Sequence, residues 1–369
     1  MRIVLTGGGT GGHIFPIIAV AKKIRELAAE DSDLEFLFLG PDGELEREAM
    51  KKELIPAKKI LSGKLRRYFS LSYIWDLIKI PIGIVQSLWQ LLVFMPDAVF
   101  SKGGYAGVPV VVAAWLYRIP ILIHESDIMP GLANQFAGRL AKKVMVSFPG
   151  AADFFNPGKV VITGNPIREE LAKGNRDEAK IFFGLSEDRK TILVMGGSQG
   201  AKIVNESVLH ILPKLLKRFE VIHLTGSSDY ENVIQEAGRI GVKVGHGGYH
   251  PFPFLREEMA RALVAADLVV SRAGANAIAE IAANGKPTII ILIKSSANNH
   301  QQLNAYALQE AGAAIVLEQD NLGENIFFEK IEEVMNSAEL QFELGERIKK
   351  FHNPDAAEKI ASEIIKLAN

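Results

Sequence analysis

One pattern occurs twice in this chain: a short run of branched apolar residues ends in a glycine-rich turn and leads into an amphipathic stretch. The first copy is RIVLTGGGTGG at 2–12, and the second is TILVMGGSQGA at 191–201. A buried strand that passes through glycines into a helix is the opening unit of a doubly wound α/β fold. Two such openings in 369 residues predict two domains of the same architecture.

The runs between these openings follow the same alternation of short apolar and longer amphipathic segments, which predicts parallel sheets with right-handed crossovers. We therefore expect an α/β protein with two Rossmann-like domains facing across a cleft. We place the linker near 164–170, the first domain at 1–165, the second at 166–351 and a closing helix at 352–369, with helices also expected at 324–336 and 339–351. The expected strands are 2–6, 35–39, 97–101, 120–124 and 143–147, then 191–197, 220–226, 267–272, 287–293 and 313–318.

Composition excludes several classes of protein. Lys and Arg number 42 against 43 Asp and Glu, so the chain has no global basic field for nucleic acid. Cysteine is absent, which excludes disulfides, thiol nucleophiles and zinc–thiolate sites. No histidine or acidic pattern has the spacing of a metal site, and we expect neither a metal nor a required cofactor. The first twenty residues lack the order of a signal peptide, which favours a cytoplasmic protein.

Three glycine-rich turns are expected at the ends of strands, at 7–12, 103–107 and 196–200. Glycine lets the backbone approach a ligand, and a following helix N-terminus favours an anion, so the turns suit phosphate or pyrophosphate. The first turn matches G-x-G-x-x-G, but Asp42 follows a Gly-Pro turn instead of ending the second strand, which disfavours a dinucleotide. His13 stands where a Walker motif needs lysine.

Acid–base candidates also lie at expected strand ends. His13 follows the first glycine turn, and His124 with Glu125 ends the fourth expected strand. Either His13 or Glu125 could deprotonate a hydroxyl at the cleft. Two further segments suit a nucleotide sugar: SRAGANAIAEIAANGKP at 271–287, whose Glu280 could accept ribose hydroxyls, and NNHQQLNA at 298–305, whose amides suit sugar hydroxyls.

The most apolar region is 71–95, but it contains Asp76, Lys79 and Pro81, which disfavours a membrane-spanning helix. Basic and aromatic residues precede and open it. They suit a surface that touches anionic headgroups, and the same pattern also fits a core helix with a solvated basic start. These residues are Lys64, Arg66, Arg67, Tyr68, Phe69 and Trp75.

Seven motifs in order carry a resemblance to a known family. They are GGGTGGHIFP (7–16), SKGGYAGVP (101–109), HESDIMPGLAN (124–134), TGNPIR (163–168), GGSQGA (196–201), SRAGANAIAEIAANGKP (271–287) and NNHQQLNA (298–305). Together they resemble the MurG family, the undecaprenyldiphospho-muramoylpentapeptide β-N-acetylglucosaminyltransferases of glycosyltransferase family 28. The resemblance extends from residue 7 to about 318, and the set of motifs is specific although no single turn is.

The resemblance implies a GT-B fold and inverting transfer of N-acetylglucosamine from UDP-GlcNAc to the 4-hydroxyl of lipid I, which makes lipid II in peptidoglycan synthesis. It assigns lipid I and membrane contact to the first domain, with Gly103, Gly104, Tyr105, His124 and Asn134 on the acceptor side, and UDP-sugar to the second. The donor contacts that it implies are Thr10, Gly11, Gly12, Asp127, Arg168, Ser198, Leu255, Ala275, Asn276, Ala277, Ile278, Ala279, Glu280, Gln301 and Gln302.

Two details of the motifs bear on these contacts. Asp127 stands where the family often has asparagine, so it keeps the acceptor oxygens and loses the amide donor. Alignment on Asn304 and Ala305 favours Gln301 over Gln302 as the sugar contact.

The resemblance also implies a peripheral protein at the cytoplasmic face of the cell membrane. Its expected partners are UDP-GlcNAc, lipid I, an anionic membrane surface and proteins of cell-wall synthesis and division, with no nucleic acid. Three alternatives stay open: another GT-B lipid glycosyltransferase of the glycosyl-diacylglycerol type, a UDP-sugar epimerase, and a non-catalytic UDP-sugar-binding protein.

Overall fold

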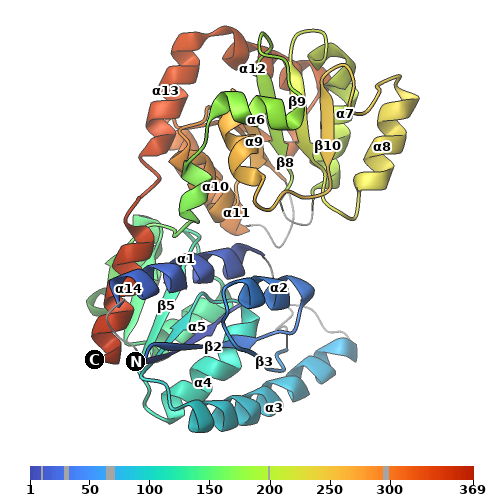
Figure 1. The fold of residues 1–369 in the computed structure, drawn as a ribbon. Helices are drawn as coiled ribbons and strands as arrows, with labels where there is room; N and C mark the ends of the chain where they lie inside the picture. The colour runs from blue at the N-terminus through green and yellow to red at the C-terminus, as the bar shows by residue number, and fades with distance from the viewer. Residues whose placement is uncertain (10, 29–32, 64–70, 198–199, 294–298) are drawn as a thin grey trace. The chain divides into compact units, whose positions relative to one another are not determined.

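The computed structural model describes residues 1–369 except 10, 29–32, 64–70, 198–199 and 294–298. The chain forms two compact units (Figure 1). The first comprises Met1–Arg168 and Asn353–Asn369, and the second comprises Glu169–His352. The predicted boundaries at 165 and 351 lie within a few residues of these limits.

The first unit is a parallel sheet in the order β3-β2-β1-β4-β5-β6-β7. Along β1, alternate residues face opposite sides: Ile3 and Leu5 join one apolar core and Val4 joins the other. The strands are β1 (Arg2–Thr6), β2 (Glu35–Gly40), β3 (Ala57–Lys59), β4 (Ala98–Ser101), β5 (Ile121–Glu125), β6 (Lys143–Val146) and β7 (Val160–Ile162).

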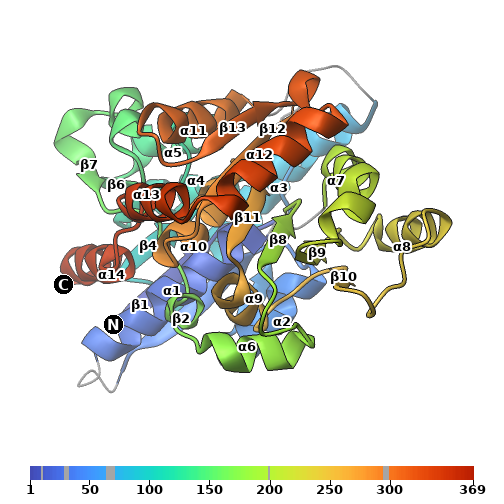
Figure 2. The same cartoon turned by 90° about the horizontal axis from the view of Figure 1, so that it is seen from above.

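Helices cover both faces of this sheet. Side chains of α1 (Gly11–Leu27), α2 (Glu44–Lys52) and α14 (Ala356–Ala368) enter the core that contains Ile3 and Leu5. Side chains of α3 (Leu71–Phe94), α4 (Val108–Leu116) and α5 (Leu132–Leu140) enter the other core. The end of the chain therefore belongs to the first unit, and α14 lies beside α1 in both views (Figures 1 and 2).

The second unit repeats the plan with the order β10-β9-β8-β11-β12-β13. Its strands are β8 (Thr191–Met195), β9 (Glu220–Leu224), β10 (Tyr249–Phe252), β11 (Leu268–Arg272), β12 (Thr288–Leu292) and β13 (Ile315–Glu318). Its helices are α6 (Arg176–Phe183), α7 (Lys202–Leu215), α8 (Tyr230–Arg239), α9 (Met259–Ala265), α10 (Ala275–Ala283), α11 (Asn299–Glu310), α12 (Glu324–Asn336) and α13 (Ala338–Lys349).

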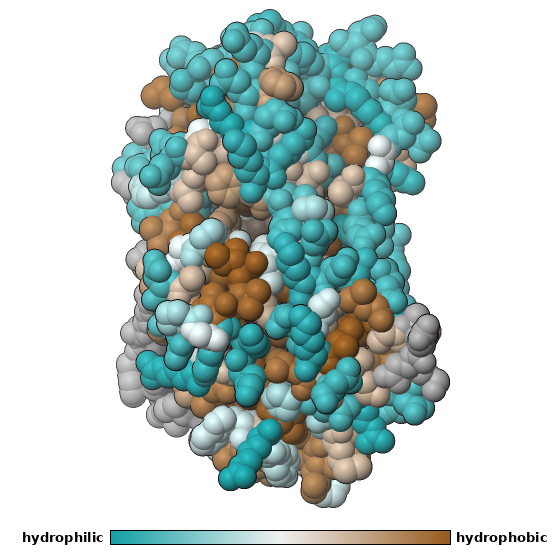
Figure 3. Space-filling model, turned by 90° about the vertical axis from the view of Figure 1, so that its left-hand side faces the viewer, coloured by the Kyte–Doolittle hydropathy of each residue, from teal (hydrophilic) through white to brown (hydrophobic). Residues whose placement is uncertain are grey.

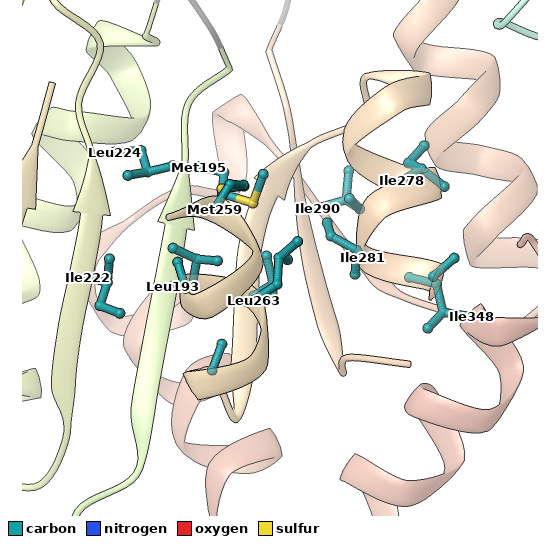
Figure 4. Packing of buried hydrophobic residues seen from close by; sticks show 14 of the residues in the cluster. Leu193, Met195, Ile222, Leu224, Met259, Leu263, Ile278, Ile281, Ile290 and Ile348 are labelled. Atoms are coloured by element: carbon teal, nitrogen blue, oxygen red, sulfur yellow. The ribbon is translucent and has the colours of Figure 1, made fainter. Parts of the chain in front are cut away.

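Figure 4 shows one of the two cores of the second unit. Leu193 and Met195 from β8 and Ile222 from β9 lie on the same side of the sheet as Met259 and Leu263 of α9. These strands are buried at every position, which explains why their sequences read as continuous apolar runs without alternation.

The sheets confirm every expected strand to within a few residues and add three that were not predicted, β3, β7 and β10. All three are edge strands. β3 contains two exposed lysines and β10 contains Pro251, so neither segment shows the apolar run that predicts a buried strand. Lysine and proline are both typical of strands at the edge of a sheet.

The apolar region at 71–95 forms α3. Among the described residues, the search for a helix of bilayer-spanning length and hydropathy finds none. The hydropathy view in Figure 3 shows one face of the molecule, where hydrophobic side chains lie in separate patches among hydrophilic ones.

Candidate active site

In each sheet the strand order reverses beside the strand that opens the unit. β1 lies between β2 and β4, and β8 lies between β9 and β11. At such a switch point the loops at the carboxyl ends of the strands diverge and leave room for a ligand. Gly7, Gly8 and Gly9 directly follow β1, Gly196 and Gly197 directly follow β8, and Gly103 and Gly104 follow β4. All three predicted turns therefore lie at switch points.

His13 lies in the first turn of α1, against the turn that follows β4. A Cβ placed on Gly104 would stand 3.3 Å from His13 Nε2, so the ring and this turn are in contact. Burial, together with the nearby charge of Lys102, lowers the pKa of His13 to about 4. The imidazole is then neutral at pH 7, as a proton acceptor has to be.

The first glycine turn holds a carboxylate that the sequence analysis did not identify. Glu46 of α2 is 5% exposed, and its Oε1 accepts a 2.9 Å hydrogen bond from the Gly9 N–H. Tyr105 covers the other side, since its hydroxyl would lie 3.3 Å from a Cβ on Gly9. With the Gly9 N–H bound to a carboxylate, the start of α1 at Gly11 and Gly12 is the part of this turn suited to an anion.

Glu125 ends β5 and is fixed by donors from its own loop and from α5. Its carboxylate accepts bonds from the Asp127 N–H at 2.9 Å, the Gly131 N–H at 3.3 Å and Asn134 Nδ2 at 2.9 Å. Burial and the charge of Asp127 raise the pKa of Glu125, while the bonds from the Asp127 N–H and Asn134 and the charge of Lys102 oppose that shift. The sequence-predicted residues Glu125 and Asn134 therefore form one hydrogen-bonded unit.

Asn134 also reaches the turn after β4. Its amide donates to the His124 carbonyl at 3.1 Å, while a Cβ on Gly103 would overlap its side chain. Its Oδ1 is buried and has no hydrogen-bond partner among the described residues. A buried acceptor without a donor is rare, and here it lies beside a glycine turn at the mouth of a switch point.

In the second unit, the turn after β8 packs tightly against the end of β9. A Cβ on Gly200 would overlap the Thr225 carbonyl oxygen, which leaves no room for a side chain. Asn205 of α7 donates to that same carbonyl at 2.9 Å, and its Oδ1 lies 3.1 Å from His223 Nε2. Tyr249 completes the chain through a 3.0 Å bond to His223 Nδ1.

Arg272 is a second residue that the sequence analysis missed. It ends β11, and its Nη1 would lie 3.9 Å from a Cβ on Gly197 in the turn after β8. Its Nε is buried and has no hydrogen-bond partner among the described residues, and burial lowers its pKa. A guanidinium in this setting suits an anionic ligand such as a phosphate. Arginine as the last residue of an expected strand, next to Ala273 and Gly274, was the available signal.

The predicted donor segment at 275–280 forms most of α10. Ile278 and Ala279 are both buried, and Ile278 belongs to the apolar core shown in Figure 4. Ala275 opens the helix, where backbone N–H groups favour an anion, and Glu280, Asn276 and Ala277 are half-buried.

Leu255 is likewise a core residue, 7% exposed. Its neighbours Phe254 and Arg256 line a pocket of about 490 Å³ together with Ser227, Glu257 and Glu258. Any ligand contact at Leu255 would therefore have to use its backbone.

Two amide residues of α11 differ in exposure. Gln301 is half-buried, while Gln302 is exposed and donates to the Tyr306 hydroxyl at 3.1 Å. Asn304, an amide of the predicted segment 298–305, is buried and donates to the Ala273 carbonyl at 3.0 Å, so it fixes the segment that leads into α10.

Some predicted residues cannot be placed. Thr10 and Ser198 lie outside the described residues, as do Lys64, Arg66, Arg67, Tyr68 and Phe69. Trp75 lies within α3. Arg168 is described, and its guanidinium carbon lies 4.5 Å from the centre of the Phe15 ring. No group of His, Asp and Glu within the described part of the chain could hold a metal ion.

Comparison with known proteins identifies the family. Residues 3–146 match the glycosyltransferase family 28 N-terminal domain, and residues 191–360 match the C-terminal domain of that family. The chain is 37% identical over 364 residues to a UDP-N-acetylglucosamine--N-acetylmuramyl-(pentapeptide) pyrophosphoryl-undecaprenol N-acetylglucosamine transferase of Bacillus thuringiensis, covering 98% of this chain and 99% of the relative. It is 38% identical over 331 residues to the transferase of Clostridium tetani, covering 89% of this chain and 88% of the relative.

Solved structures agree with this result. The crystal structure of MurG from Acinetobacter baumannii superposes with a TM-score of 0.74 at 26% identity and covers 99% of both chains. A UDP-GlcNAc 2-epimerase from Neisseria meningitidis gives 0.71 at 14% identity, covering 99% of this chain and all of the epimerase, and shows the shared fold only. With both domains matched and curated relatives above 30% identity over most of the chain, this protein belongs to glycosyltransferase family 28.

Proposed function

We propose that the protein transfers N-acetylglucosamine from UDP-GlcNAc to the 4-hydroxyl of N-acetylmuramoyl-(pentapeptide)-pyrophosphoryl-undecaprenol, lipid I, and so forms lipid II. The observation that carries this proposal is a neutral, half-buried His13 held against the glycine turn of β4 at a switch point. The names of the relatives support the donor and the acceptor.

In the proposed reaction, His13 takes the proton of the acceptor hydroxyl. The freed oxygen attacks the anomeric carbon of the sugar, the bond from that carbon to the diphosphate breaks, and UDP leaves with the electron pair. Attack from the face opposite the diphosphate inverts the anomeric centre. Glu125 is the alternative base, and its three hydrogen-bond donors hold it in a fixed orientation.

We assign the donor to the second unit. The start of α10 and the turn after β8 would stabilise the charge that develops on the leaving diphosphate, and Arg272 would add a positive charge. The pocket beside Phe254 and Arg256 has the size for a nucleobase with its ribose. Glu280 and Gln301 are our candidates for the ribose and sugar hydroxyls.

We assign the acceptor to the first unit, with its diphosphate near Gly11 and Gly12. An acceptor with an undecaprenyl chain lies in a bilayer, so this unit would have to meet the membrane surface. One face of α3 supports such a role: exposed apolar side chains recur at Ile78, Ile82, Val85, Trp89 and Leu92. This three- and four-residue spacing is that of a single helix face.

Exposed Trp115 and Leu116 at the end of α4, which packs against α3, add to the apolar surface. We therefore propose a peripheral protein at the cytoplasmic face of the cell membrane. Exposed apolar side chains that recur along one helix face are typical of membrane or protein contact. Proteins of cell-wall synthesis and division are the partners that we expect there.

The test is UDP release from UDP-GlcNAc, with and without a short-chain lipid I analogue, followed by mass analysis of the product. We expect release only with the acceptor, and a product that has gained one N-acetylhexosamine. Donor binding without acceptor-dependent release would overturn the proposed acceptor and favour another lipid or a non-catalytic role. Conversion of UDP-GlcNAc to its 2-epimer without any acceptor would favour an epimerase.

A further inference from the structure

A lysine side chain is buried at the end of β4 in the first unit. Lys102 is 2% exposed, and its ammonium group contacts three other buried or half-buried polar groups. These are His124 Nδ1 at 2.6 Å, Asn165 Oδ1 at 3.3 Å and the Ser126 hydroxyl. Four side chains therefore form one hydrogen-bonded cluster: Lys102 directly after β4, His124 in β5, Ser126 directly after β5, and Asn165.

Lys102 determines which nitrogen of His124 carries the proton. Because the ammonium group donates to Nδ1, the proton of neutral His124 is on Nε2, which lies 3.0 Å from the Gly164 carbonyl. The segment at 164–165 is thus bound twice, by His124 at Gly164 and by Lys102 at Asn165. Gly164 has a φ of +85°, and the Asn353 side chain packs where a Cβ would lie, so this segment has little freedom to move.

The same side chain lies beneath the proposed acceptor site. Its Cβ would stand 3.3 Å from a Cβ on Gly7, and its backbone N–H donates to the Thr6 carbonyl at 2.9 Å. The titratable groups that face it are His13 from α1, His124 and Glu125 from β5, and Asp127 from the next loop. A buried cation is costly unless anions balance it, and Glu125 with Asp127 provides that balance.

We propose that Lys102 is a positioning residue for the transfer reaction: it fixes the orientation of His124 and segment 164–165, and it places a positive charge beside His13 and Glu125. This inference rests on the proposed function. Burial lowers the pKa of Lys102 to about 7, against the opposing effects of Glu125 and Asp127, so its positive charge is present below that pH. Over that pH range it opposes protonation of either candidate base.

The central variant is Lys102→Met, which keeps an unbranched side chain, one atom shorter, and removes the charge. We expect kcat to fall roughly tenfold or more with the KM for UDP-GlcNAc within about twofold, because the donor is assigned to the other unit. The acid limb of the kcat/KM profile should move up by about one pH unit, because a nearby positive charge that lowers the pKa of the base is lost. Lys102→Arg should return the acid limb toward that of the parent protein.

Lys180→Met is the matched control. Lys180 is a buried lysine of the second unit whose ammonium group donates only to backbone carbonyls, those of Ser186, Glu187 and Arg189 among its described contacts. Its loss should affect stability and leave the acid limb in place. A Lys102→Met protein with the parent's kcat and acid limb would overturn the proposal.

A second measurement does not depend on activity or on a folded variant. Nitrogen-15 NMR of the imidazoles in the unmodified protein should show His124 protonated at Nε2 and unprotonated at Nδ1. Protonation at Nδ1 would overturn the proposed cluster. If the unmodified protein transfers no sugar while His124 shows the expected tautomer, the proposed function fails and the cluster stands.

Discussion

The imidazole of His13 lies directly against Gly104, with 3.3 Å between His13 Nε2 and the position that a Cβ on Gly104 would take. The two residues come from α1 and from the turn after β4, so their contact depends on the pairing of β1 with β4. Gly104 has a φ of +81° and a ψ of 160°, a backbone conformation that only glycine adopts readily. The position of the proposed base therefore depends on a turn whose backbone conformation requires glycine.

Removal of the His13 imidazole should reduce kcat by roughly 10²–10⁴ if it is the general base. His13→Ala should leave donor affinity unchanged, because UDP-GlcNAc is assigned to the second unit. UDP release and isothermal titration with UDP measure the two quantities. The exposed His246 gives the control His246→Ala, which should behave as the parent. A loss of less than tenfold in His13→Ala would transfer the role of base to Glu125.

A methyl group on Gly104 should displace the base without removing it. Gly104→Ala introduces strain of about 1–3 kcal/mol and brings Cβ close to His13 Nε2. We expect a loss in kcat of at least tenfold, together with a lowered midpoint of urea unfolding. Gly184→Ala is the control, because Gly184 has a φ of +67° and nothing within 4 Å of its Cβ position. If both variants lose stability equally and neither loses activity, the contact with His13 has no role in transfer.

Lowering the pH should destabilise the folded protein, because a buried histidine that stays neutral in the fold takes up a proton when the chain unfolds. Burial lowers the pKa of His223 to about 3, so between about pH 6.5 and 3 the unfolded chain binds a proton that the folded chain does not. This contribution to stability is complete above pH 6.5 and is lost as the pH falls, at about 1.4 kcal/mol per pH unit.

His223→Gln should therefore flatten the pH dependence of the free energy of unfolding below pH 6.5. It should also lower stability at pH 7 by about 1–3 kcal/mol, because the bonds to Asn205 and Tyr249 are disturbed. Urea titrations at several pH values measure both effects. His210→Gln, at an exposed position of α7, should retain the full slope. Equal slopes in the two variants would contradict this account.

Polar substitutions on α3 should weaken membrane binding. Val85, Trp89 and Leu92 are between 56% and 66% exposed, and their joint replacement by Ser should lower partitioning to phosphatidylglycerol vesicles by roughly tenfold to a hundredfold. Co-sedimentation measures this partitioning. Ile181→Ser with Phe342→Ser removes equally exposed apolar side chains from the second unit and should have little effect. Transfer to a water-soluble acceptor analogue should persist in both proteins.

The sequence alone determined the repeated strand–glycine–helix opening, the central strands and the three glycine turns, because burial on both faces and a required backbone conformation both limit residue choice locally. It also placed His13 and Glu125 at strand ends. The sequence did not predict the edge strands β3, β7 and β10, because a partly exposed strand does not need apolar residues at every position.

Only the tertiary structure decided which side chains meet. Lys102 reads as an ordinary lysine before a glycine turn, and its role in the cluster arises from segments 22 and 63 residues away, at His124 and Asn165. Glu46 likewise contacts Gly9 across 37 residues. Such contacts depend on the strand order, and a local pattern of residues contains no information about which distant strands become neighbours. The same reason explains why Ile278 and Leu255 could be assigned to a ligand segment while their side chains lie in the core.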